Sequence, residues 1–465
     1  MNLKLGKSLM AVAVSSLLVT PLAQATNGMF AEGTGAKSRA MGGSGIAYPT
    51  ETGSIVANPA AAVHLGDRYD AALGLFSPSP RSYAITGNDC SAGFPVACGG
   101  GTLNSSQESD ENLFFIPFLG FTWAIDDKTS VAFVGSALGG MNATWKKNPF
   151  APFGATGPMG INLQQMRLGM TVARKITDKF SFGITPSIVV QRFNAKGLGT
   201  PNVVPALNTG FAGYSVNPFA MTNNAHQTSN GLGIKIGAMY DLGGGLTLGA
   251  AYEPETNMTN FSRYAGLFAE NGDLNIPSNY TIGLAWKASS DLTVALDYMK
   301  INYTDVASMS NDSQRLTDVC GAARLGFIPA SAATESTCLG GANGAGFGWD
   351  DMKIIKLGVE WMASEGMAYR IGWNHGASPI DEEDAVINIL APGVVEDHLT
   401  MGMTMAMGSD SEITIDYVHA FANDVSGSLP AAFGSFAPLP VAGTEGTAKI
   451  EMEQNFLEVG YGKRF

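Results

Sequence analysis

The sequence has few charged residues, and after residue 25 it has no apolar stretch long enough to be a membrane-spanning helix. Only 14% of its 465 residues are charged, whereas 45% are hydrophobic. A typical soluble chain carries about 25% charged residues. The deficit suggests a surface that meets something other than water. In a transmembrane β-barrel such a surface is built from alternating residues instead of continuous runs. Composition alone leaves a large secreted all-β protein as the alternative.

Cysteine is scarce, and basic residues are fewer than acidic ones. The formal net charge of -13 argues against a nucleic-acid partner. The four cysteines form two local pairs, and in an oxidising compartment these predict the disulfides Cys90–Cys98 and Cys320–Cys338. Neither pair has CxxC spacing or a nearby histidine, so a zinc site is not expected. The sequence predicts neither a metal nor a cofactor.

The N-terminus has the features of a secretory signal peptide. Lys4 and Lys7 precede an apolar run over residues 9–19, and the small-residue site Ala23-Gln24-Ala25 follows. The run is too short for a membrane anchor, which needs about 20 apolar residues. We therefore expect residues 1–25 to be removed and Thr26 to become the mature N-terminus.

From about residue 67 to the end, apolar side chains recur at every second position, which is the period of a β-strand. In one example, Ile413, Ile415 and Tyr417 alternate with smaller or polar residues. Fourteen such runs are expected to be strands: 67–77, 112–125, 129–141, 162–176, 179–193, 229–241, 245–255, 277–288, 291–303, 351–363, 367–374, 397–408, 411–422 and 450–465.

The connections between these runs alternate between short turns and long loops. The seven long loops are expected at 78–111, 142–161, 194–228, 256–276, 304–350, 375–396 and 423–449. Alternating loop lengths and an even strand count are typical of an outer-membrane barrel of a Gram-negative bacterium. The terminal Phe465 lies on the apolar face of the last run, as in the aromatic girdle of such barrels. The expected surroundings are therefore outer-membrane lipid and lipopolysaccharide, after folding by the barrel-assembly machinery.

The segment between the signal peptide and the first run contains eight glycines and lacks clean alternation. A barrel of fourteen strands encloses a lumen that its own side chains cannot fill. The predicted fold is thus all-β: residues 67–465 form a 14-stranded antiparallel transmembrane β-barrel, and residues 26–66 form a hatch that plugs it.

Three short motifs resemble the FadL/TodX family of outer-membrane transporters for hydrophobic compounds. They are "NGMF" at 27–30, "GTGAKSRAMGGSGIA" at 33–47 and "NPAA" at 58–61. The resemblance implies a monomeric barrel with an N-terminal hatch, an outer groove formed by the third and fourth long loops, a second site in the lumen, and lateral exit beside a kinked third strand. It implies long-chain fatty acids or monoaromatic hydrocarbons as cargo.

Residues in the third and fourth long loops are candidates for the walls of that groove, because two loops that expose apolar side chains could form a cleft. Packing of these side chains on neighbouring loops is the alternative. The candidates are Phe211, Tyr214, Phe219, Met221, Phe261, Tyr264, Leu267 and Phe268, of which those in the fourth loop have helical spacing. Arg263 is a candidate partner for a ligand carboxylate, although a loop arginine is often simply solvated.

The hatch and the third strand supply the remaining candidates. Asn27, Met29 and Phe30 are expected to reach into the lumen, whereas Asn58, Pro59 and Ala60 are expected to dock the hatch on the wall. Gly135, Gly139 and Gly140 lie within the third run. Glycine inside a strand marks a bulge or bend, which fits a lateral opening; free use of glycine on a lumenal face is the alternative.

The resulting hypothesis is a passive channel for hydrophobic molecules, most of all long-chain fatty acids, and not an enzyme. A general porin would need an open, charged constriction, which the hatch and the apolar loops argue against. An outer-membrane phospholipase would need a paired nucleophile and base. The sequence has no G-x-S-x-G motif, and its histidines are scattered: His64, His226, His375, His398 and His419. An adhesive role for the long loops is a further alternative.

Overall fold

The structure is a computed structural model. It describes residues 27–89, 102–151, 155–203, 208–321, 323, 328–428 and 446–465. The expected signal peptide, Cys90 and Cys98 lie outside these residues.

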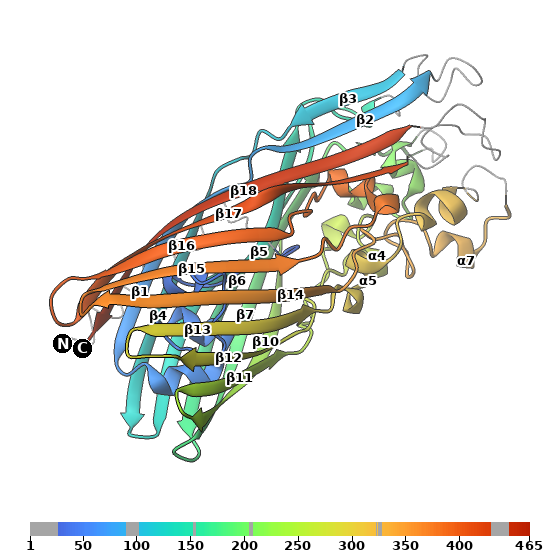
Figure 1. Cartoon of the computed structure of the whole chain (residues 1–465). Coiled ribbons are helices and arrows are strands. Elements are labelled where there is room, and N and C mark those ends of the chain that lie inside the picture. Colours follow the sequence, from blue (N-terminus) through green and yellow to red (C-terminus); the bar gives the residue numbers. More distant parts are fainter. Residues whose placement is uncertain are drawn as a thin grey trace.

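Fourteen antiparallel strands close into a barrel, which confirms the predicted fold class (Figure 1). Closure is made by β1 and β18, which pair from Arg68↔Arg464 to Ser77↔Asn455. The wall consists of β1 (Arg68–Ser77), β4 (Phe114–Asp126), β5 (Thr129–Trp145), β6 (Met159–Lys175), β7 (Phe180–Lys196), β10 (Gln227–Gly243), β11 (Leu246–Glu253), β12 (Asn279–Lys287), β13 (Leu292–Ile301), β14 (Met352–Ser364), β15 (Met367–Gly376), β16 (Asp397–Ala406), β17 (Ser411–Ser428) and β18 (Thr447–Arg464).

The first long loop contains a β-hairpin that the sequence pattern did not predict. Its strands β2 (Arg81–Asp89) and β3 (Thr102–Glu108) pair with each other, and β2 also pairs with the outer half of β18. The prediction of a strandless loop over 78–111 was therefore wrong. The apolar alternation is confined to Tyr83 and Ile85 of β2, which are buried in the loops, whereas β3 is built mainly of polar residues. A further two-stranded hairpin, β8 (Gly199–Thr200) and β9 (Thr209–Gly210), lies in the third loop.

The barrel wall is apolar outside and polar inside. On β18, Leu457 and Val459 are exposed while the intervening Glu458 is buried. The same inversion recurs around the wall, where large apolar side chains are exposed and charged groups such as Arg167 and Glu360 are buried. Because the exposed side chains would otherwise contact water, this distribution fits a barrel surrounded by lipid.

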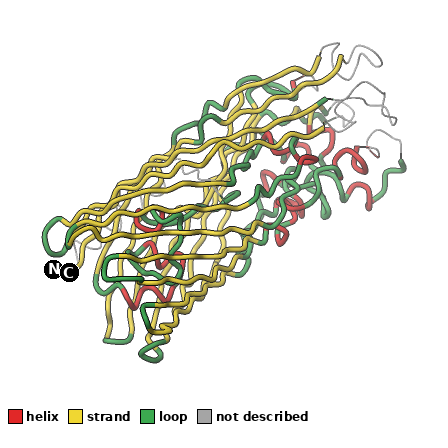
Figure 2. Tube along the Cα trace, viewed as in Figure 1, coloured by secondary structure: helices red, strands yellow, loops and turns green. Residues whose placement is uncertain are grey.

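Short helices occupy both ends of the molecule (Figure 2). None of the helices in the described ranges is long and apolar enough to span a bilayer. The N-terminal segment contains α2 (Ala36–Arg39), α3 (Gly53–Ala57) and η1 (Pro59–His64). The loops contain η5 (Phe211–Tyr214), η6 (Pro218–Ala220), η7 (Ser262–Tyr264), α4 (Ala269–Gly272), η8 (Tyr303–Asp305), α5 (Ala307–Ser310), η9 (Leu316–Gly321), α7 (Ala332–Glu335), η10 (Glu382–Asp384) and η11 (Ile387–Ile389).

The N-terminal segment, residues 27–66, lies inside the barrel and contacts strands on opposite sides of it (Figure 1). Gly42 N donates to Thr400 Oγ1 of β16 at 2.8 Å, and Ile46 N donates to Asp297 Oδ2 of β13 at 3.0 Å. The η1 helix packs against β6, β7 and β10. The segment thus occupies the lumen that the strands cannot fill.

Candidate functional site: an apolar pocket beside an interruption of the wall

The candidate groove residues are gathered in one apolar cluster at the loop end of the barrel, and most of them are buried within it. The buried members are Phe211, Met221, Phe261, Tyr264, Leu267 and Phe268. Tyr214 is partly buried against the cluster, and Phe219 is 56% exposed. The fourth loop forms two short turns, η7 and α4, instead of one continuous helix. The apolar side chains therefore pack inward on other loops and on the wall.

Phe193 of β7 is the centre of this cluster, and sequence reasoning missed it. Its ring centroid lies 4.8 Å from those of Tyr264 and Phe268, and 5.6 Å from that of Phe261. Such aromatic pairs contribute beyond their buried area. The signal in the sequence was a large aromatic residue close to the loop end of a lumen-facing strand.

A small apolar cavity lies between this cluster and the N-terminus of the described chain. It measures about 20 Å³, and its lining includes Met29, Met141, Phe193, Phe268 and Trp349. Such a volume holds about one water-sized molecule. A hydrocarbon ligand could enter only if side chains or the N-terminal residues moved.

The residues Asn27 to Phe30, here called the N-terminal turn, are held by Tyr303 at the end of β13. The Tyr303 hydroxyl donates to the Asn27 carbonyl at 2.7 Å and accepts a hydrogen bond from Met29 N at 2.8 Å. Burial raises the pKa of Tyr303 well above its usual range, so the hydroxyl remains protonated. Its ring also packs against Trp349, with centroids 5.1 Å apart. The N-terminal turn is therefore fixed at the edge of the apolar cavity.

Beside the N-terminal turn, the hydrogen-bonded wall is interrupted. Pairing of β4 with β5 begins at Phe118↔Ser136 and continues toward the short turns. Among the described residues, segments 111–117 and 137–143 form no ladder with each other. We call these two segments the wall interruption. Beyond it, Asp110 N donates to Thr144 O at 3.1 Å and contact resumes.

The predicted glycines lie on the strand that borders the wall interruption. The register of β5 against β6 shifts between Ala137 and Gly139, which is a β-bulge. Gly139 bridges Phe30, and Gly140 N donates to Met29 O at 3.3 Å. A Cβ at Gly139 would collide with the Met29 carbonyl. Gly135, in contrast, pairs regularly with Leu119. Gly139 thus allows the N-terminal turn to lie directly against the interrupted wall.

The Asn58-Pro59-Ala60 motif holds the N-terminal segment to the wall. Asn58 Nδ2 donates to the carbonyls of Ile46 and Ala238, at 2.8 and 3.1 Å, and Asn58 Oδ1 accepts from Ala60 N. Pro59 takes the first position of η1, where a missing N–H costs nothing. Sequence reasoning had given these residues the same docking role.

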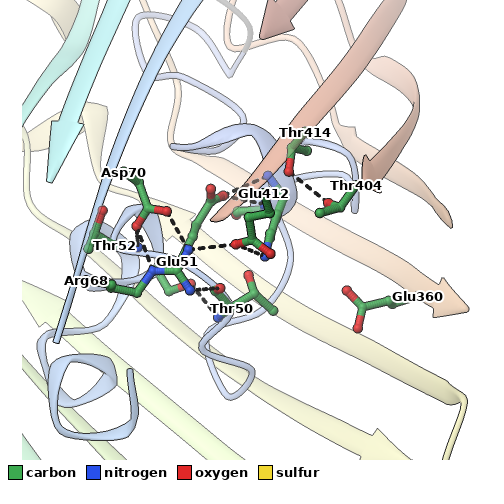
Figure 3. A network of polar contacts seen from close by, with 12 residues as sticks. Thr50, Glu51, Thr52, Arg68, Asp70, Glu360, Thr404, Glu412 and Thr414 are labelled. Atoms are coloured by element: carbon green, nitrogen blue, oxygen red, sulfur yellow. Dashed lines mark hydrogen bonds and ion pairs between the residues drawn. The ribbon is translucent and has the colours of Figure 1, made fainter. Parts of the chain in front are cut away.

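Ion pairs also fix the N-terminal segment to β17 and β18, and Figure 3 shows the part of the network around Glu412 and Arg68. Glu412 Oε1 accepts from Lys37 Nζ at 2.6 Å and from Arg68 Nη2 at 2.8 Å. Arg39 bridges Glu32 and Glu458, with both N···O distances at 2.6 Å. Sequence reasoning missed the pairs with Glu412 and Glu458 because their partners are hundreds of residues away, and it also missed the local Arg39–Glu32 pair. Removing one member of such a buried pair leaves an uncompensated charge, which is strongly destabilising.

Three other candidates have contacts that bear on their proposed roles. Arg263 Nη1 donates to the carbonyls of Asn224 and His226, so the guanidinium links the third and fourth loops. The structure joins Cys320 to Cys338 by a disulfide in the fifth loop. His64 Nε2 lies 2.9 Å from Ser181 Oγ, but among the described residues no carboxylate pairs with the His64 ring.

A closed antiparallel barrel with an apolar outer face and a charged, filled lumen is the architecture of an outer-membrane channel protein. The chain belongs to the outer membrane protein transport protein family (OMPP1/FadL/TodX), whose model matches residues 16–432. The resemblance seen in the sequence is thereby confirmed.

Solved structures share this fold at low sequence identity. The toluene transporter TodX of Pseudomonas putida superposes with a TM-score of 0.59, at 17% identity, over 93% of this chain and 99% of that one. A FadL homologue of Pseudomonas aeruginosa gives 0.65, at 13% identity, over 94% and 100%. The toluene transporter TbuX of Ralstonia pickettii gives 0.58, at 16% identity, over 93% and 99%.

Among curated sequences, a protein of Chlorobium limicola is 54% identical over 50 residues. It is described only as an uncharacterized protein in the 5′ region of a phosphoenolpyruvate carboxykinase gene. The match spans 11% of this chain and a quarter of that protein.

Proposed function

We propose that this protein is a passive channel that takes up hydrophobic molecules through the outer membrane, with long-chain fatty acids as its foremost cargo. The observation that carries the proposal is the apolar cavity between the loops and the N-terminal turn, next to the wall interruption. A ligand entering between the third and fourth loops would meet the aromatic side chains around Phe193 before it reached the N-terminal turn.

The route continues through the wall and not through the lumen. Residues 26–66 act as a hatch, because their ion pairs and hydrogen bonds to opposite strands block a straight path to the periplasm. When the N-terminal turn moves away from Gly139, the wall interruption becomes the lateral exit. An apolar molecule then passes into the membrane without being released into water.

The physical need for such a route follows from the cost of exposing an alkyl chain to water. Each buried methylene contributes about 0.8 kcal/mol, so a chain of about fourteen methylenes gains on the order of 10 kcal/mol in gross terms. A series of apolar sites retains that gain, whereas a watery pore would lose it. We therefore rank a general porin below a hydrophobe channel.

Monoaromatic hydrocarbons are the alternative cargo. Two of the structural relatives are described as toluene transporters, and another is described as a FadL homologue. The route proposed here is the same for both cargo classes. We also propose that the protein acts as a monomer and that residues 1–25 direct its export.

Uptake by outer-membrane vesicles tests the proposal. Vesicles with and without the protein, at matched expression, are given labelled oleate, labelled toluene or labelled glucose. We expect faster oleate entry, and we expect it to be lost when Phe261 and Phe268 are replaced by aspartate. Charged substitution of Val203, a third-loop side chain that is 86% exposed and lies outside the apolar cluster, is the control. Faster entry of toluene alone would assign the aromatic cargo. Faster entry of glucose would contradict the proposal.

A further inference from the structure

Five arginines are buried in the described chain, and one of them differs from the rest in its partners. These are Arg39, Arg68, Arg81, Arg167 and Arg370. Four of the five are paired with carboxylates: Arg39 with Glu32 and Glu458, Arg68 with Asp70, Arg167 with Glu253, and Arg370 with Glu360. Arg81, which is only 4% exposed, has no carboxylate within ion-pair distance among the described residues.

The hydrogen bonds of Arg81 leave part of its guanidinium unused. Nη2 donates to Ser109 Oγ at 3.1 Å and to the Glu111 carbonyl at 2.6 Å. Nε is buried and has no hydrogen-bond partner. A buried cation without a carboxylate in ion-pair contact is unfavourable, since burial removes the water that would otherwise stabilise the charge, and the Glu111 carboxylate offsets this only by longer-range attraction. The arrangement suits a guanidinium whose anion arrives with a ligand.

Arg81 lies at the outer end of the wall interruption. Its acceptor Ser109 Oγ also accepts from Thr144 N of β5 at 3.1 Å, and its acceptor Glu111 begins one of the two segments of the wall interruption. Arg81 begins β2 opposite Met452 of β18, and Met452 belongs to the apolar cluster that contains Met29 and Phe193. Arg81 therefore lies between the apolar cluster and the proposed exit, and a ligand would reach its buried Nε only after neighbouring side chains moved.

We infer that Arg81 binds the carboxylate of an amphiphilic substrate at the wall interruption while the alkyl chain occupies the apolar path. Nη2 already donates to two acceptors, so the carboxylate would accept from Nε, and such a charge-assisted hydrogen bond is about twice as strong as a neutral one. This inference rests on the proposed function and narrows it: the favoured substrates are fatty acids, not neutral hydrocarbons. It also replaces Arg263 as the carboxylate partner, since Arg263 Nη1 is already directed at loop carbonyls.

The test compares an acid with neutral molecules of the same chain. Vesicles carrying wild-type protein or Arg81→Met take up labelled dodecanoate, its methyl ester and dodecane. We expect Arg81→Met to reduce dodecanoate entry on the order of 10- to 100-fold, the range of a charge-assisted hydrogen bond, and to leave the two neutral probes nearly unchanged. Arg81→Lys should restore part of the acid uptake. Arg174→Met, at an exposed arginine near the short turns, should have no effect.

The ratio of acid to ester uptake within each variant does not depend on how much protein folds. An equal loss for acid and ester would show that Arg81 only braces Ser109 and Glu111, and it would overturn the inference. Acid and ester uptake that both stay at the wild-type level in Arg81→Met would also overturn it. So would a loss of the acid preference in Arg263→Gln but not in Arg81→Met.

Equilibrium binding of dodecanoate and 1-dodecanol to the purified full-length protein separates this inference from the proposed function. If the wild type transports neither probe but binds dodecanoate more tightly than dodecanol through Arg81, the transport proposal fails and the carboxylate site stands. If transport occurs with no acid preference, the transport proposal stands and the site fails.

Discussion

Replacing Tyr303 with phenylalanine should release the N-terminal turn while leaving the surrounding apolar packing in place. The ring contacts with Phe30 and Trp349 would remain, at centroid distances of 6.2 and 5.1 Å. The substitution removes the only side chain that binds the Asn27 carbonyl and Met29 N in the described contacts. The Asn27 carbonyl keeps its bond from Phe30 N, but Met29 N loses its side-chain acceptor, and leaving such a buried group unpaired costs about 1–3 kcal/mol. The opening equilibrium of the turn should therefore increase roughly 5- to 150-fold.

Hydrogen exchange followed at the Met29 amide measures this opening directly. A suitable control is Tyr83→Phe, because Tyr83 is also buried and its hydroxyl makes two hydrogen bonds, to Ser105 Oγ and Lys147 O, away from the N-terminal turn. Exchange at Met29 should accelerate only in Tyr303→Phe. If Met29 exchanged at the wild-type rate in Tyr303→Phe, or equally fast in both variants, the reasoning that Tyr303 fixes the turn would be refuted.

Three further predictions concern other parts of the proposed route. Gly139→Val should displace the N-terminal turn, because its Cβ collides with the Met29 carbonyl, and should increase proteolysis of residues 27–35; unchanged proteolysis would contradict this. Arg39→Met should destabilise the N-terminal segment by about 3–5 kcal/mol by leaving Glu32 and Glu458 unpaired, measured as a lower urea midpoint for tryptic cleavage in that segment, whereas Arg174→Met should not change it. Burial raises the pKa of Asp384, in η10, to about 6, so its contribution is fully present below its unfolded pKa of about 4 and is lost as the pH rises through 6. The sixth loop should therefore be cleaved faster at pH 7.5 than at pH 5, and Asp384→Asn should remove that difference.

The fourteen wall strands could be predicted from sequence because one physical requirement shaped all of them. Lipid outside and a polar lumen inside force period-two alternation, as in Leu457, Glu458 and Val459. The β2–β3 hairpin could not be found in that way, because its apolar alternation is limited to Tyr83 and Ile85 and its partner strand β3 is mainly polar.

The candidate site could be predicted only in part. Gly139 and Asn58 were identifiable because a glycine in a strand and an Asn-Pro step have local backbone consequences. Most of the apolar loop candidates lie together in one buried cluster, but whether they line an open groove or pack together depends on long-range contacts with Phe193. Nothing in the sequence singled out Arg81, because its proposed binding role depends on the absence of a carboxylate in ion-pair contact, which only the fold shows.

The central claim is that cargo leaves through the wall interruption, and site-specific obstruction tests it most directly. Leu113, 56% exposed within the wall interruption, is replaced with cysteine and modified with a bulky maleimide; Leu232→Cys, at an 81% exposed position on β10, is the matched control. The unsubstituted protein given the same reagent corrects for native cysteines. Modification at position 113 should abolish oleate uptake by vesicles, and modification at position 232 should not. Undiminished uptake after complete modification at position 113 would contradict lateral exit.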